Sequence, residues 1–192
     1  MYKNRMSYSL AAMLWFILVI LVVSYHGYHS RIFASANTTH IVDSPEKAYL
    51  IWKEKNVKGR VLLLFDNYPH MRGLNSYNGS PHLHQGNIVE FSIFQNIIRK
   101  VYFIIPDNAW EEFRLLEIMH PLRAVPNLER GLFLYNLSGI PIIATTPTSL
   151  PKISETALVY INKGVYNDTQ AQDLLSMKHI TADITVVYQG RH

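Results

Sequence analysis

Cysteine is absent from this 192-residue chain, which excludes disulfide bonds, thiol catalysis and cysteine-ligated metal. The fold must therefore depend on its apolar core alone. Glycine-rich phosphate loops and Gly-x-Ser-x-Gly nucleophile turns are also missing from the sequence. These absences exclude several enzyme classes and leave open whether the chain is an enzyme at all.

Acidic residues are absent from the first 36 residues, which hold three of the 18 Lys and Arg and none of the 14 Asp and Glu. The rest of the chain is therefore nearly neutral, although the sequence pI is about 9.2. Its one basic cluster consists of Lys53, Lys55, Lys58 and Arg60. A solvated helix end explains such a cluster, because cations favour a helix carboxyl terminus. No concentrated basic face remains, so we expect no nucleic-acid partner.

The long apolar segment of the chain is the unbroken run Leu10–Val23, which lies in a charge-free window from Met6 to His29. A window of more than about 20 residues can cross a hydrocarbon core about 30 Å thick as a helix. The alternative is a cleaved secretory signal, because Ala34-Ser35-Ala36 has the small-x-small form of a cleavage site. The apolar run ends well before that site, which favours an uncleaved anchor.

Basic residues set the expected orientation of this anchor. Lys3 and Arg5 precede the helix and Arg31 alone follows closely, which predicts a cytoplasmic amino terminus. We expect a cytoplasmic start over residues 1–7, a transmembrane signal-anchor helix over 8–28, a tether over 29–40 and an extracytoplasmic domain over 41–192. The expected location is that of a single-pass membrane protein with a periplasmic or extracellular domain.

The first part of this domain has the pattern of alternating helices and strands. Ser44-Pro45 has the residue types that start a helix, and Val61–Phe65 is a run of five apolar residues. Such a run predicts a strand covered on both faces, and Val101–Ile105 repeats it. Asn108 and Glu111 then resemble a capping box for a following helix.

The second part supplies further strands and helices. The apolar residues in 88–98 fit both the spacing of a helix and the alternation of a strand, and we favour a helix that leads into the strand at 101. Residues 132–135 and 140–144 predict a tight β-hairpin, residues 157–161 and 184–188 predict strands, and residues 170–177 predict a short helix. The whole predicts an α/β fold: a single three-layer domain with a mixed, largely parallel sheet of five or six strands.

Two carboxylates follow the two buried strands directly. Asp66 follows Val61–Phe65, and Asp107 comes just after Val101–Ile105. The carboxyl ends of parallel strands meet at one edge, where α/β proteins bind ligands. Asp66 is a candidate catalytic residue or a turn former, whereas Asp107 is either ligand-binding or a helix-cap or turn residue. Thr145, at the start of a hydroxyl-rich stretch, is a second candidate ligand-binding residue, although such stretches are ordinary in turns.

Three histidines lie in the long polar loop after Asp66, namely His70, His82 and His84. Two imidazoles one residue apart can converge on a metal, and a nearby carboxylate and third histidine would complete a zinc-like ligand set. His82 and His84 are therefore candidate metal ligands together with Asp66 and His70, and His70 would join Asp66 in catalysis. Histidines in a polar loop also commonly bind nothing, so a protein without cofactor is the other reading.

Four Asn-x-Ser/Thr sequons are present, at Asn37, Asn78, Asn136 and Asn167. They would carry glycans only in a eukaryotic secretory pathway, and the sequence does not reveal the kingdom of origin.

Two functions fit these features. The favoured one is a membrane-anchored extracytoplasmic binding or assembly domain, whose partners would be the membrane and an envelope protein. The alternative is a hydrolase dependent on a divalent metal such as zinc, which would activate water for attack on an envelope or extracellular substrate.

Overall fold

The apolar run after Arg60 forms the central strand of a large sheet. The computed structural model describes residues 38–71, 73–74, 76–77, 80–119, 125–127 and 132–190. Strand β2 (Arg60–Phe65) lies between β5 (Ile98–Ile104) and β9 (Ala157–Asn162) and is parallel to both. Residues 61–65 are at most 1% exposed. This burial on both faces explains why five apolar residues occur in a row where a half-exposed strand would alternate.

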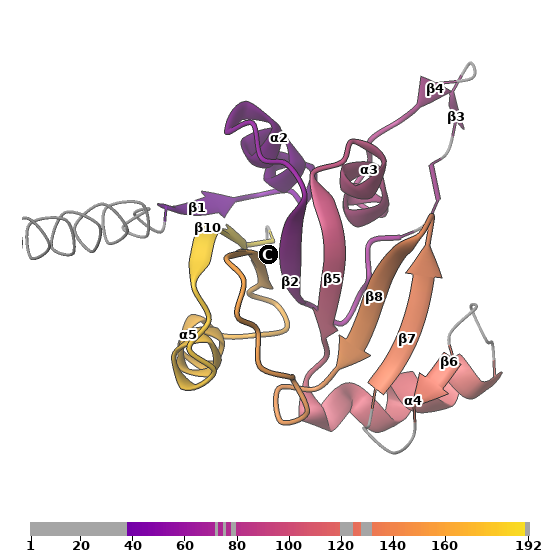
Figure 1. The fold of residues 1–192 in the computed structure, drawn as a ribbon, viewed down its shortest axis with the longest axis vertical. Helices are drawn as coiled ribbons and strands as arrows, with labels where there is room; N and C mark the ends of the chain where they lie inside the picture. Colours follow the sequence, from indigo (N-terminus) through magenta and orange to yellow (C-terminus); the bar gives the residue numbers. More distant parts are fainter. Residues whose placement is uncertain are drawn as a thin grey trace, which may run out of the picture. The chain divides into compact units, whose positions relative to one another are not determined.

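The sheet extends to eight strands in the order β1-β10-β9-β2-β5-β8-β7-β6. Neighbours are parallel from β1 (Thr38–Val42) through β10 (Ala182–Tyr188) to β8 (Ile140–Thr145). Strands β7 (Leu132–Leu137) and β6 (Val125–Asn127) are added antiparallel, and the arrows of β7 and β8 point in opposite directions in Figure 1. A separate short ribbon pairs β3 (Ser76–Tyr77) with β4 (Ser80–Pro81). The predicted α/β class with a largely parallel sheet is confirmed, and the predicted count of five or six strands is too low.

The two strands at the sheet's edges explain the undercount. In β1, of sequence Thr-Thr-His-Ile-Val, Val42 alone is buried. Strand β6 has three residues, and the middle one is Pro126. Edge strands have one neighbour and need little apolar surface, so hydrophobic pattern does not reveal them.

The β7–β8 hairpin has the expected tight turn. Ser138 and Gly139 form its two-residue loop, with φ angles of 53° and 83°. Positive φ at both positions is the signature of a type I′ turn, whose twist matches that of the strands. The Asn136 side chain accepts a hydrogen bond from the Gly139 N–H at 2.9 Å.

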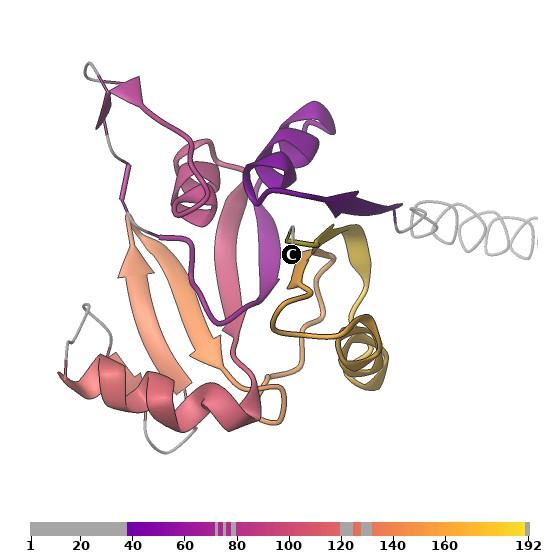
Figure 2. The same ribbon diagram turned by 180° about the vertical axis from the view of Figure 1, so that it is seen from behind.

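Helices cover both faces of the sheet. Helices α2 (Glu46–Glu54), α3 (Ile88–Phe94) and α4 (Trp110–Met119) contribute to one core cluster, around Leu62, Leu64 and Phe103. Helix α5 (Asp168–Met177) contributes to the other, around Leu63, Phe65 and Ile104. Figures 1 and 2 show α2 and α3 side by side, with α5 apart from them. Because successive side chains of β2 point to opposite faces, this one strand contributes to both core clusters.

Two helix starts differ from the prediction. Helix α2 begins at Glu46 with Pro45 as its cap residue and no side-chain capping bond, because the Ser44 carbonyl rather than its hydroxyl accepts the Lys47 N–H. The segment after Pro106 first forms a 3-10 turn, η1 (Asp107–Ala109), which also lacks a side-chain cap. The segment at 88–98 divides as expected into α3 and the start of β5.

Residues 37–192 form one compact unit. The predicted cytoplasmic start, the transmembrane helix at 8–28 and the tether up to residue 37 lie outside the described residues, as does Asn78. Within the described ranges, no helix has the length and apolar character needed to cross a bilayer.

Candidate functional site

The candidate site lies where the sheet reverses its winding. From β2 the chain passes through α3 to β5 on one side, and later returns to β9 on the other side of β2. The loops after β2 and β9 therefore leave the same edge in opposite directions, and α/β proteins bind ligands at such switch points. Asp66 and Asn162 stand here, at the ends of these two strands.

Asp66 is fully buried and accepts hydrogen bonds from its own chain on both oxygens. Its Oδ1 accepts the backbone N–H groups of Asn67 at 2.7 Å and Tyr68 at 3.2 Å. The Asn162 amide nitrogen lies 3.0 Å from Oδ1 and 3.1 Å from Oδ2. A buried carboxylate needs such donors, because an unpaired charge away from water is costly.

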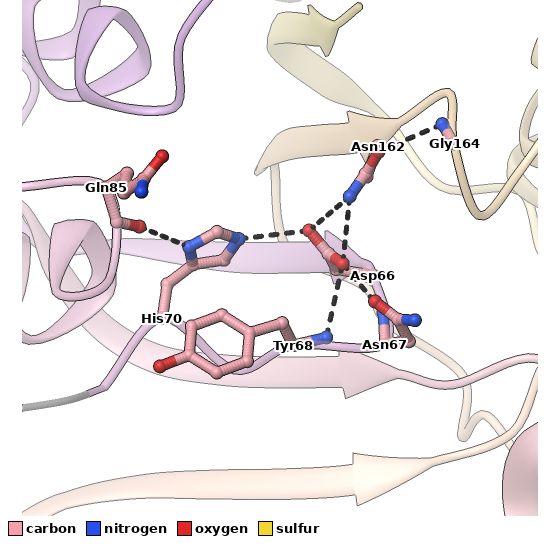
Figure 3. A network of polar contacts seen from close by, with 7 residues as sticks. All are labelled: Asp66, Asn67, Tyr68, His70, Gln85, Asn162 and Gly164. Atoms are coloured by element: carbon pink, nitrogen blue, oxygen red, sulfur yellow. Dashed lines mark hydrogen bonds and ion pairs between the residues drawn. The ribbon is translucent and has the colours of Figure 1, made fainter. Parts of the chain in front are cut away.

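His70 completes this network from within the same loop (Figure 3). Its Nε2 lies 3.0 Å from Asp66 Oδ2, and its Nδ1 donates to the Gln85 carbonyl at 2.6 Å. A carbonyl can only accept, so Nδ1 carries a proton, and one further proton lies between the imidazole and the carboxylate. The ring packs edge-on against Tyr68 and Tyr160, with centroids 5.0 and 5.7 Å away. Both ring nitrogens are thus engaged within the chain.

The network joins three distant parts of the sequence. Asn162 bridges to Asp66 across 96 positions, and its own Oδ1 accepts the Gly164 N–H at 2.9 Å. Sequence reasoning missed Asn162, although the signal was present. Asn162 follows the apolar run 157–161 in the same way that Asp66 follows the run 61–65.

Asn87 is a second buried polar residue that the sequence did not reveal. It is fully buried, and its Nδ2 donates to the carbonyls of Gly73 at 3.1 Å and His82 at 2.9 Å. Its Oδ1 accepts the His84 N–H at 2.9 Å. Asn87 therefore fixes both arms of the loop that Asp66 and His70 fix at its start.

The four candidate metal ligands lie in different surroundings. Asp66 and His70 are in contact, whereas the ring of His84 accepts the Gly86 N–H at 3.1 Å. In the part of the chain that the structure describes, which includes Asp66, His70, His82 and His84, no three His, Asp or Glu side chains form a metal-sized group. His70, whose nitrogens face Gln85 and Asp66, presents neither of them to an ion.

Asp107 and Thr145 lie in contrasting surroundings. Asp107 is exposed and accepts a hydrogen bond from the Thr148 hydroxyl, at 3.2 Å to Oδ1 and 3.4 Å to Oδ2. Thr145 is fully buried, and its hydroxyl donates to the Thr146 carbonyl at 3.3 Å. Asp107 is therefore available to a ligand, whereas Thr145 is enclosed at the end of β8.

A hollow of about 560 Å³ opens beside Asp107, and we call it the edge hollow. It lies beyond the carboxyl ends of β5, β8 and β9 and against α5. Its described lining comprises Pro106, Asp107, Asn108, Pro147, Tyr166 and Asp173, with Val165, Gln170, Leu174 and Met177. The charged residues in this lining, Asp107 and Asp173, are both acidic.

Two buried tyrosines flank the site. The Tyr166 hydroxyl donates to the Ile104 carbonyl at 3.2 Å, and burial, followed by the charges of Asp107 and Asp66, raises its pKa. Burial also raises the pKa of Tyr160, with Asp66 as the next cause. The Tyr160 hydroxyl has no hydrogen-bond partner among the described residues. Both phenols therefore stay neutral at physiological pH.

Comparison with known proteins found no matching family model, no matching curated protein and no matching solved structure. The geometry of the site is therefore the basis for the function proposed below.

Proposed function

We propose that this chain is a membrane-anchored extracytoplasmic binding domain that holds a small polar ligand in the edge hollow. The observation that carries the proposal is the position of that hollow, beyond the carboxyl ends of three parallel strands and beside the winding reversal. Rigid strands there present loop side chains to a ligand. Asp107 supplies a carboxylate that Thr148 orients at 3.2 Å.

The charge of the lining indicates the class of ligand. Asp107 and Asp173 place two carboxylates in the described lining with no basic residue among them. Carboxylates accept hydrogen bonds and attract cations, and they repel anions. We therefore expect a ligand that carries hydroxyl or ammonium groups, such as a polyol, an amino sugar or a polyamine.

The polar network at Asp66 supports binding over catalysis. A general acid or base must reach the proton that it transfers. Asp66 is fully buried, and its oxygens accept from Asn67, Tyr68, Asn162 and His70. We assign Asp66 and His70 the role of bracing the loops beside the hollow.

The anchored placement depends on the sequence before the domain. The apolar run Leu10–Val23 follows Lys3 and Arg5, which favours a cytoplasmic start. A reporter enzyme active only outside the cytoplasm should work when fused after His192. Activity of a cytoplasmic reporter alone at that position would contradict the orientation.

Thermal unfolding of the full chain in lipid nanodiscs tests ligand binding. We would add sorbitol, glucosamine and spermidine as probes, with malonate as an anionic comparison. A probe at 100 times its Kd should raise Tm by roughly 5–10 °C, since binding to the native state adds stability. The rise should disappear in Asp107→Asn, which keeps an acceptor for Thr148 and removes the charge.

Glu54→Gln, at an exposed position on α2, is the matched control and should respond as the wild type does. No Tm rise with any of the three probes, or an equal rise in Asp107→Asn, would contradict the proposal. A rise with malonate alone would reverse the expected ligand charge.

A further inference from the structure

A second hollow lies on the opposite face of the sheet from α5, and we call it the face hollow. Its volume is about 270 Å³. Helices α3 and α4 lie near opposite ends of this face (Figure 1), and the hollow is bounded by both of them and by the β7–β8 hairpin. The apolar side chains that line it include Met71, Phe103, Phe113, Tyr135, Leu137 and Ile142.

One wall of the face hollow is held by buried polar contacts. The segment on either side of His70 contributes Pro69, Met71 and Gly73 to the lining. The Gly73 N–H donates to Glu90 Oε2 at 2.6 Å, and its carbonyl accepts from the fully buried Asn87 at 3.1 Å. Because both the N–H and the carbonyl of Gly73 are held, this wall is already ordered before a ligand binds, and less conformational entropy is lost on binding.

Aromatic rings and one carboxylate define the chemistry of this hollow. Phe103 and Phe113 meet edge to face at 5.9 Å, and Tyr135 lies on the neighbouring hairpin. Among the described residues of the lining, Glu90 alone carries a charge. Ring faces attract cations, and a carboxylate in an apolar wall attracts them further and repels anions.

We propose that the face hollow binds a small aromatic ammonium compound, with its ring among the apolar side chains and its ammonium group at Glu90. The volume fits this class. A cavity of about 150 Å³ accepts benzene, so in proportion the face hollow of about 270 Å³ has room for about eleven non-hydrogen atoms. This site is separate from the edge hollow and does not depend on the function proposed above.

Calorimetric titration of the full chain in nanodiscs tests this proposal with three probes of similar size. Tryptamine carries the ammonium group, tryptophol replaces it with a hydroxyl, and indole-3-acetate is an anion. Tryptamine should bind at least about tenfold more tightly than tryptophol, and indole-3-acetate should bind weakest. Glu90→Gln, whose amide oxygen can still accept the Gly73 N–H, should remove the tryptamine advantage and leave tryptophol unchanged.

Two control variants separate the possible outcomes. Phe113→Leu should weaken tryptamine and tryptophol together, because it alters the apolar part of the site. Glu54→Gln, at an exposed position on α2 outside the lining of either hollow, should leave tryptamine binding unchanged. Equal binding of tryptamine and tryptophol, binding unaffected by Glu90→Gln, or no binding of tryptamine to a chain with a normal melting transition would each overturn the proposal.

Discussion

Asp66 and Asp107 follow neighbouring parallel strands, yet the fold uses them in opposite ways. Asp66 is buried under the loops after β2 and β9, where two backbone N–H groups, an amide and an imidazole surround it. Asp107 lies exposed at the rim of the edge hollow with the Thr148 hydroxyl. The difference comes from what lies beyond each strand end. The loops after β2 and β9 cover Asp66, whereas β5 ends beside the edge hollow. A carboxylate at a strand end therefore becomes a brace or a recognition group according to what packs beyond it.

The largest expected effect is the loss of protein stability when Asp66 is replaced. Asp66→Ala should reduce the free energy of unfolding by about 3–5 kcal/mol, because it leaves buried His70 and two backbone donors without their acceptor. Asp107→Ala, at an exposed position, should change it by less than about 0.5 kcal/mol. Urea unfolding of both variants measures the contrast. Similar losses at the two positions would show that Asp107 is also structural.

Alkaline pH should lower the free energy of unfolding through the two buried tyrosines beside Asp66 and Asp107. Burial raises the pKa of Tyr160 and of Tyr166 above the usual value of 10.0. Their contribution to stability is complete below pH 10, where both states are protonated. Above pH 10 the unfolded chain loses these protons and the native protein keeps them, so stability should fall by about 1.4 kcal/mol per pH unit for each tyrosine.

Unfolding midpoints between pH 9 and pH 12 measure this slope. Tyr160→Phe and Tyr166→Phe should each remove one tyrosine's share of it. A wild-type slope that neither variant changes would mean that other groups cause the alkaline loss.

The smallest expected effect separates the two hydroxyl groups at neutral pH. Tyr166→Phe should cost about 1 kcal/mol, because it removes one of two hydrogen bonds to the Ile104 carbonyl, which keeps the Asp66 N–H at 3.3 Å. Tyr160→Phe should cost nothing measurable or add stability, since it removes a buried hydroxyl without a partner among the described residues. Thermal unfolding of the two variants side by side checks this, and a cost for Tyr160→Phe equal to that for Tyr166→Phe would reveal a hydrogen bond at Tyr160.

The sequence predicts the centre of this fold better than its edges. The apolar runs at 61–65 and 101–105 identify β2 and β5, because strands buried on both faces need continuous apolar sequence. Strands β1 and β6 carry little of that signal, since one residue of β1 is buried and β6 contains Pro126.

The candidate site was predictable only in part. The position of Asp66 at a strand end follows from the sequence, but its partner Asn162 lies 96 residues away, and pairing at that distance depends on strand order. The hydrogen bond from His70 to the Gln85 carbonyl cannot be predicted from the sequence either, because every residue offers the same backbone acceptor. A histidine-rich loop predicts a possible metal site, and the backbone contacts of its histidines cannot be predicted from the sequence.

Strand β1 has a mechanical consequence for a domain held by its amino terminus. It is the first strand after the predicted anchor in the sequence, and five register pairs join it in parallel to β10, from Thr38 with Ile184 to Val42 with Tyr188. If the predicted anchor holds the chain, tension along it would reach β1 at Thr38. Ladder hydrogen bonds run across the strand, so a pull along β1 loads all five pairs together rather than opening them one at a time. An anchor before the domain would therefore load this short strand in shear against β10.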